Sequence, residues 1–435
     1  METGDAVHGW VPQPDTRGTM DIVWTCVVTT ILCTYAILCL NCPPRDEGLI
    51  GELRRKLLWV GIGIVGPEFV LTIAFDQFVR ARDSVAMFRQ EKSGLKTWTY
   101  RHAFFANMGG FELSCPDCPP FRINSQHIQW LVNHRYINPP EISEEELWDK
   151  SKHDTLARVI TCLQCGYMIL TCIGRTVQGL AITTLELSTL AMVVCSLMTS
   201  ICWLRKPLDV RYPVRITMTT PIAEVLHRAG SIATQPYRQN PLDFIDDYRP
   251  SWALNVHTCM SFASGNGIRP LTRVGDSRMP KLTWKESPYL CIATLMYASI
   301  HLIGWRYTFP TRVEQTLWRI SSCILVATTV SYWLVQGIAK ASNTRYFEKG
   351  IMKQSGQRVD TDLELGKKDD EAGSETLRPA RMQLKSKAFF WRVLPLAIAY
   401  ALARGYIIFE ALLGLRSLPA SAYLNIEWLS LIPHL

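Results

Sequence analysis

Two acidic residues, Glu68 and Asp76, lie in a stretch of chain that is otherwise apolar. They are eight positions apart, so on a helix that turns about 100° per residue they lie roughly 80° apart and share one broad face. Paired carboxylates can relay protons, bind a cation or protonate a substrate. A structural role is the alternative: Glu68 would satisfy backbone groups freed at Gly66 and Pro67, and Asp76 would lie at the edge of the apolar stretch.

Three further ionisable residues lie within later apolar stretches. His301 can take up and release a proton near neutral pH, although a histidine among apolar neighbours is also found as a hydrogen-bonded part of the packing. It completes, with Glu68 and Asp76, the set of candidate catalytic residues. Arg404 and Glu410 are six positions apart, which places them on nearly opposite sides of one helix. We therefore expect each of these two to find its partner on another helix.

Arg175 and Glu186 flank a short turn between two apolar stretches. A cation and an anion at such a turn can pair across the mouth of a cavity between the helices. The alternative is that both anchor the turn at the edge of the apolar region through a local salt bridge.

Two short patterns resemble cofactor or metal motifs. Gly61, Gly63 and Gly66 have the spacing of a dinucleotide-binding loop, but that loop follows a strand, whereas these glycines lie inside an apolar stretch and indicate close helix packing or a kink. Cys115 and Cys118 have the spacing of zinc ligands, but no second cysteine pair follows. A zinc site there would need nearby histidines, so we expect no cofactor and no metal.

The elements that position these residues are long apolar runs. Several runs approach 20 residues with one charge or none, which is the length of a helix that crosses a bilayer core of about 30 Å. In lipid such runs must be helical, because lipid offers the backbone no hydrogen-bond partners. The predicted fold is therefore an all-α, polytopic transmembrane helical bundle with about seven apolar segments, of which six or seven span the membrane.

The apolar runs divide the chain into eight predicted regions. Ser143 and Glu146 form a capping-box pattern, which predicts a helix start within the first long polar region. The regions are a polar N-terminal segment (1–19), two apolar segments of which the second is broken by Gly and Pro (20–79), a long polar loop with amphipathic helices (80–155), a helical hairpin (156–204), a second long polar loop (205–286), a second helical hairpin (287–338), a charged and disordered loop (340–387), and a C-terminal helix and tail (388–435).

The net charge of +8 comes from Lys and Arg concentrated between the apolar runs. This bias is typical of cytoplasmic loops, and with acidic residues interspersed it predicts no nucleic-acid partner. Seven spans with the long loops inside place the N-terminus inside, yet the charge around the first span argues the reverse: Arg17 precedes it, while Arg45, Arg54, Arg55 and Lys56 follow. A re-entrant second segment would reconcile the two.

The 14 cysteines do not form the pattern of a disulfide framework. Many lie in the apolar runs, where cysteine behaves as a small hydrophobic residue. These include Cys26, Cys33, Cys39, Cys162, Cys172, Cys195, Cys202 and Cys323.

A series of landmarks spans nearly the whole chain. They are HAFFANMGGF (102–111), DKSK (149–152), RTVQGLAITTLEL (175–187), WLRKPLDV (203–210) and LRSLP (415–419) with the final PHL (433–435). In this order they resemble a large family of fungal multi-pass membrane proteins without an established general function. The resemblance implies a fungal source and an integral membrane location, in the plasma membrane or an endomembrane, and brings no catalytic residues.

Three functional hypotheses stay open, and the sequence leaves undecided whether the protein is an enzyme. The one narrowly preferred is a protein that acts on or holds a lipophilic small molecule in the bilayer, by acid–base chemistry in fungal specialised metabolism. The second is a proton or cation channel or a small-molecule transporter, with the broken second segment forming the site. The third is a non-catalytic scaffold or receptor whose basic loops bind anionic lipid or protein partners of undefined identity.

Overall fold

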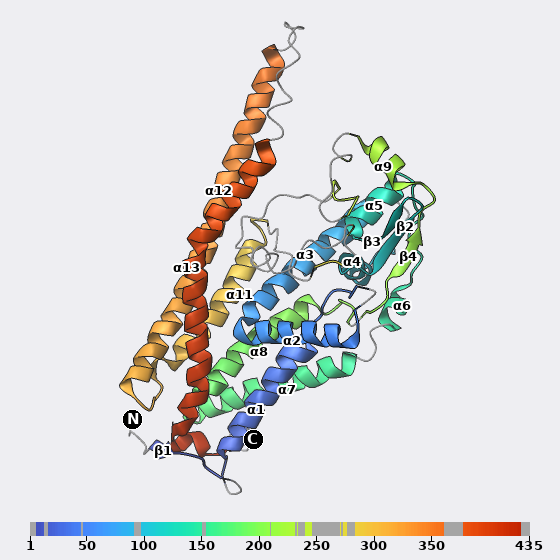
Figure 1. Cartoon of the computed structure of the whole chain (residues 1–435). Coiled ribbons are helices and arrows are strands. Elements are labelled where there is room, and N and C mark those ends of the chain that lie inside the picture. The colour runs from blue at the N-terminus through green and yellow to red at the C-terminus, as the bar shows by residue number, and fades with distance from the viewer. Residues whose placement is uncertain are drawn as a thin grey trace, which may run out of the picture.

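A bundle of long helices carries a smaller domain of short helices and strands at one end (Figure 1). The structure is a computed structural model, and the residues it describes are 6–12, 16–44, 47–90, 97–149, 154–208, 210–230, 233, 240–245, 270, 273–275, 283–360 and 377–427.

Six helices of the described chain are long and apolar enough to cross a membrane, and a bent pair raises the number to seven if it counts as one span. The prediction of a mostly helical protein with six or seven such segments is confirmed. The six are α1 (Thr19–Ile31) with the π-helical turn η1 (Leu32–Ala36), α7 (Asp154–Val177), α8 (Thr184–Cys202), α11 (Ser287–Ile300) with the 3₁₀ turn η2 (His301–Arg306), α12 (Arg312–Asp360) and α13 (Leu377–Leu413).

The bent pair consists of α2 (Leu49–Val65) and α3 (Pro67–Gln90), which meet at 111°. Pro67 suits the first turn of α3, because its missing amide needs no partner there, but it cannot continue α2. Gly66 lies between them, and a Cβ at this position would come within 2.4 Å of the Phe69 ring. The Gly–Pro step therefore breaks the apolar segment into two helices.

The start of α2 and the end of α3 both lie at the end of the bundle that carries the small domain. Near the start of α2, Glu52 pairs with Arg211 at 3.2 Å, and near the end of α3, Phe88 belongs to the core of the small domain. The two helices thus enter the bundle and return to the end from which they came, and we call them the re-entrant hairpin. Helix α3 continues past residue 79, where the apolar segment was expected to end, and reaches Gln90 because its polar second half extends into the small domain.

The small domain combines the two long polar regions. Its sheet has the order β3-β2-β4, in which β2 pairs antiparallel with β3 and parallel with β4, about 100 positions further along the chain. The all-α prediction is therefore wrong for this part of the molecule, because these strands are too short to show a period of two. The domain contains β2 (Phe111–Cys115), β3 (Cys118–Ile123), β4 (Val214–Thr217), α4 (Tyr100–Asn107), α5 (Ser125–Asn133), α6 (Glu144–Asp149) and α9 (Ile222–Ala229).

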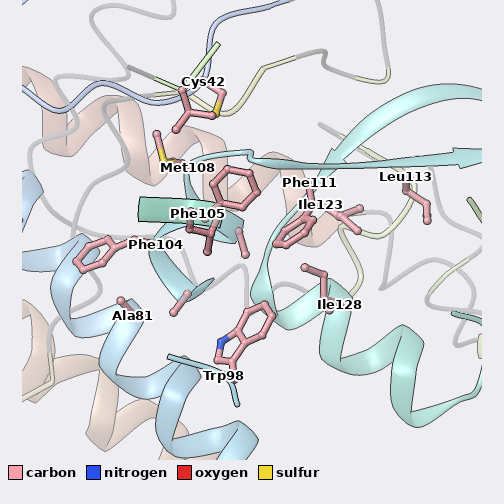
Figure 2. Packing of buried hydrophobic residues seen from close by; sticks show 14 of the residues in the cluster. Cys42, Ala81, Trp98, Phe104, Phe105, Met108, Phe111, Leu113, Ile123 and Ile128 are labelled. Atoms are coloured by element: carbon pink, nitrogen blue, oxygen red, sulfur yellow. The ribbon is translucent and has the colours of Figure 1, made fainter. Parts of the chain in front are cut away.

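Aromatic side chains fill the core of this domain, as Figure 2 shows. The Phe105 and Phe111 rings meet edge to face at 5.0 Å, and Trp98 lies 4.5 Å from Phe88 between ring centroids. A Cβ at Gly110 would come within 2.6 Å of the Phe105 ring. The HAFFANMGGF motif is therefore a helix, a tight turn and a strand that close on one another. The predicted capping box opens α6, with the Glu146 amide donating to the Ser143 hydroxyl at 3.0 Å.

Segments from the two ends of the chain meet at the opposite end of the bundle (Figure 1). Strand β1 (Ala6–His8) pairs antiparallel with β5 (Ser417–Pro419), which lies between the 3₁₀ turns η3 (Gly414–Arg416) and η4 (Ala420–Tyr423). Six crossings of the bundle account for this placement, since an even number returns the chain to its starting end.

The charged region predicted to be disordered is partly helical. Helix α12 continues to Asp360 and α13 begins at Leu377, so the C-terminal helix starts earlier than residue 388. Ala, Lys, Glu, Gln and Arg in these stretches have high helix propensity, which extends the two helices beyond their apolar parts. Residues 361–376 lie outside the described part of the chain.

Replacing the fully buried Phe111 by Ala should lower the free energy of unfolding by about 3–5 kcal/mol, because the core loses its contacts and gains a cavity. Thermal unfolding of the purified chain and limited proteolysis of the small domain measure this loss. The exposed Tyr212 provides the control, and Tyr212→Ala should change stability by no more than about 0.5 kcal/mol. Equal effects of both changes would contradict the packing described here.

Candidate functional site

Polar side chains converge on the tip of the re-entrant hairpin, deep among apolar helices. The Arg404 guanidinium of α13 donates to the backbone carbonyls of Val65 at 3.0 Å and Ile64 at 3.3 Å. Its Nη1 lies 2.9 Å from Nε2 of His301. Only 1% of Arg404 is exposed. We call Arg404, His301, Glu68, Tyr400 and Tyr297 the polar centre.

Arg404 is needed because the hairpin tip leaves backbone groups without partners. The last carbonyls of a helix have no partner within it, and Pro67, which has no amide, cannot supply one. In an apolar surrounding each unsatisfied carbonyl costs on the order of 1–3 kcal/mol. The guanidinium donates to two of these carbonyls and so stabilises the break.

His301 takes part as a neutral side chain. A guanidinium can only donate hydrogen bonds, so Nε2 of His301 accepts and the ring proton lies on Nδ1. Its backbone carbonyl accepts from the Trp318 indole at 3.1 Å and from the Ser322 hydroxyl at 3.4 Å. These bonds replace α-helical ones at the point where α11 tightens into the 3₁₀ turn η2.

Glu68 lies in the first turn of α3 and accepts a hydrogen bond from the Tyr400 hydroxyl through Oε1. Tyr400 and Arg404 are one turn apart on α13, so they face the same side. Beneath the guanidinium, 5.5 Å from its central carbon, lies the ring of Tyr297. Glu68 Oε2 and the Tyr297 hydroxyl are buried and have no hydrogen-bond partner among the described residues. Buried polar atoms of this kind are rare in folded proteins.

Asp76 lies apart from the polar centre. Eight residues along α3 correspond to about 12 Å, and Asp76 instead pairs with Arg80 at 2.8 Å. Glu68 and Asp76 therefore do not form a directly paired couple in this structure.

Arg175 binds the C-terminal segment rather than Glu186. Its guanidinium donates to the carbonyls of Ala181 at 2.8 Å, Ser421 at 2.8 Å, Ala422 at 2.9 Å and Leu424 at 3.0 Å. This buried cation ties the turn between α7 and α8 to η4. The alternative of a structural anchor fits this geometry better than a gate at a cavity mouth.

Glu186 caps the start of α8. Its Oε2 accepts from the Thr183 amide at 2.9 Å, while the Glu186 amide donates to the Thr183 hydroxyl at 3.2 Å. Its other oxygen, Oε1, pairs with Arg17 from the segment before α1. Glu186 thus joins the N-terminal segment to the same end of the bundle.

Glu410 accepts from the Tyr406 hydroxyl at 3.1 Å, on its own helix. Nearby, Glu314 of α12 pairs with Arg416 of η3. Arg404 thus has its partners on other elements, as its position on α13 led us to expect, whereas the expectation was wrong for Glu410, whose hydroxyl partner lies one turn away on the same helix.

Lys206 is a buried cation that sequence analysis did not single out. Its Nζ donates to the Cys39 carbonyl at 2.6 Å, to Gln77 Oε1 at 2.8 Å and to Asn41 Oδ1 at 3.2 Å. The charge also lies 4.9 Å from the Trp203 ring centroid. In the sequence, Lys206 stands just before Pro207, which follows the end of an apolar stretch. That position suggested only a residue at the edge of the membrane. Tyr400 was missed as well, although its spacing of four from Arg404 was a usable signal.

The two motif-like patterns have structural roles. A Cβ at Gly63 would lie 3.5 Å from Thr34 of η1, an ordinary contact distance, so this glycine lies against η1 inside the helix packing and not in a nucleotide-binding loop. Between Cys115 and Cys118, Asp117 caps α9 by accepting from the amides of Ile222 at 2.7 Å and Ala223 at 2.9 Å. Desolvation raises the pKa of Asp117, but these amides outweigh it and hold the pKa below its usual value. No group of three or more His, Cys, Asp or Glu within the described ranges could hold a metal ion.

Comparison with known proteins adds a family. The model of a family of unknown function (DUF8562) matches residues 2–232 and 285–435. The chain belongs to this family. The match covers both halves of the polar centre, with Glu68 in the first stretch and His301 and Arg404 in the second. No curated protein and no solved structure matches the chain.

Replacing Arg404 by Ala should destabilise the protein by about 3–5 kcal/mol, because two carbonyls and His301 Nε2 lose their donor in a buried site. Thermal unfolding in detergent measures the loss, and protease cleavage near residue 66 reports opening of the hairpin tip. Arg312, which is exposed, serves as the matched control, and Arg312→Ala should leave both measurements unchanged. If the two variants behave alike, Arg404 does not hold the break.

Proposed function

We propose that the protein is a six-span integral membrane protein that conducts or transports protons or small cations through its polar centre. The observation that carries the proposal is the carboxyl group of Glu68, held at the tip of a re-entrant hairpin with one oxygen unpartnered. Broken helices with polar tips form the substrate sites of many transporters. Ionisable residues among apolar helices are costly and mark ion or proton paths.

The proposed topology has six spans and one re-entrant hairpin. It puts β1, β5, the turn between α7 and α8 and the turn between α11 and α12 on one side of the membrane. The small domain and the charged region 340–387 lie on the other side. The basic side is then cytoplasmic, and the charges around the first span agree with it. From the resemblance to the fungal family, we also propose that the protein comes from a fungus and lies in the plasma membrane or an endomembrane.

An epitope tag at the C-terminus and one inserted within residues 361–376 should lie on opposite sides of the membrane. Protease protection of tagged membrane vesicles, with and without detergent, measures the side of each tag. Protection of both tags, or of neither, in sealed vesicles of known orientation contradicts the six-span topology.

The polar centre holds the groups that proton transfer needs, a carboxyl group and a hydroxyl group in contact. The Tyr400 hydroxyl on Glu68 provides a neighbour that can pass a proton on.

The same hydroxyl–carboxyl pair supports a second candidate, acid–base chemistry on a lipophilic small molecule. In that case the polar centre would protonate a substrate that enters from the bilayer. Reaction of a lipophilic substrate without ion flux separates this candidate from transport.

Glu68→Gln should reduce proton flux into reconstituted vesicles to the rate of protein-free vesicles, because glutamine keeps the shape but carries no exchangeable carboxyl proton. A pH-sensitive dye inside the vesicles measures the flux. The matched control is Asp76→Asn, which changes a second buried acid on the same helix and should retain flux. Full flux in Glu68→Gln vesicles, or no flux of protons or metal cations with the unaltered protein, contradicts the proposal.

A further inference from the structure

The helices α1, α7 and α8 enclose an unusual core between them. In this cluster of seven buried residues, four are cysteines, two are methionines and the seventh is Val193. Each is at most 5% exposed. We call the six sulfur-containing residues the sulfur core: Cys26, Cys33, Cys165, Met168, Cys172 and Met192.

Two thiols of this core are in direct contact. Cys33 in η1 and Cys165 in α7 have their Sγ atoms 3.4 Å apart. Met168 follows Cys165 by three residues, so its thioether lies on the same face of α7. Cys26 lies seven residues before Cys33 and Cys172 lies seven residues after Cys165, about two turns in each case, and both belong to the same buried cluster. The sulfur atoms therefore line a seam between α1 and α7.

The contact between the thiols adjoins a small cavity. Cys33 lines it, together with Thr34, Ser196 and Thr199, and the cavity offers about 20 Å³ to water. Its wall includes the π-helical turn η1, and π-helical turns occur frequently at functional sites. The Ser196 hydroxyl donates to the Cys33 carbonyl at 3.3 Å. A small ion thus has space beside Cys33, whose thiol touches that of Cys165, while Cys165 and Met168 do not belong to the cavity wall.

We propose that Cys33 and Cys165, with Met168 about one turn further along α7 in the same cluster, bind a soft monovalent cation of the copper(I) class. Thiolate and thioether ligands select copper(I) over cations that prefer oxygen. A structural zinc needs four ligands, and the described residues hold no group of even three His, Cys, Asp or Glu.

Charge balance favours a monovalent ion. Copper(I) displaces one proton from one thiol, this proton passes to water, and the second sulfur donates as a neutral thiol or thioether. The copper stays at +1, so the complex is neutral. Burying a neutral complex among apolar helices avoids the large cost of a buried net charge, which a divalent ion on the same ligands would leave.

The site is independent of the proposed ion path. Glu68 and Arg404 are not part of the sulfur core, so the Glu68→Gln variant should bind copper(I) as the unaltered protein does. Failure of copper binding and failure of proton flux are therefore separate results.

The test is an anaerobic titration of the purified full chain in detergent with copper(I) supplied as its bicinchoninate complex, whose absorbance falls as the protein takes the ion. Each of Cys33→Ser and Cys165→Ser should weaken binding by about 100-fold or more, because losing a ligand costs at least as much as losing an outer partner of a metal site. The matched control is Cys195→Ser, which changes a buried cysteine outside the sulfur core and should keep the affinity.

X-ray absorption at the copper edge of the loaded, unaltered protein needs no variant and should show sulfur neighbours only. The proposal is overturned by copper uptake no greater than that of detergent alone, by unchanged affinity in both serine variants, or by oxygen and nitrogen neighbours at the copper. A thiol count showing that the two cysteines join as a disulfide, with no copper bound after reduction, overturns it as well.

Discussion

Hydrogen bonds from the Arg404 guanidinium to the Ile64 and Val65 carbonyls allow the chain to turn back inside an apolar bundle. A helix break in such surroundings is tolerated only where other groups satisfy the freed backbone. The polar centre follows from this constraint, because the cation that satisfies the carbonyls also attracts His301 and lies one turn from the tyrosine that binds Glu68. Structural support and the proposed site of proton exchange are thus built from the same residues.

The same solution recurs where other irregular segments are buried. Arg175 satisfies carbonyls of the C-terminal segment at one end of the bundle, and Lys206 satisfies the Cys39 carbonyl near the small domain at the other. At each place a buried cation supplies donors where water has no access. Charged residues in apolar surroundings are costly, and these three offset that cost by binding groups that would otherwise be unsatisfied.

The small domain holds the re-entrant hairpin from outside the bundle. It receives the end of α3 through Phe88, and its β4 strand follows α8 in the chain. On the other face of the hairpin, Gly63 approaches Thr34 closely enough to bring α2 against η1 and the cavity beside the sulfur core. The hairpin therefore lies between the polar centre and the sulfur core, and it contributes residues to the surroundings of both.

The sequence by itself determined the long apolar helices, the break at Gly66 and Pro67 and the family resemblance, because the length of an apolar run, proline chemistry and ordered motifs are local properties of the chain. It also singled out Glu68, His301 and Arg404 as ionisable residues in apolar stretches. Only the tertiary structure decided that these three meet at one hairpin tip while Asp76 and Arg175 do not. The parallel pairing of β2 with β4 and the contact of Cys33 with Cys165 likewise join positions about 100 or more apart. Such contacts depend on how helices and strands pack in space, which no local period or spacing encodes.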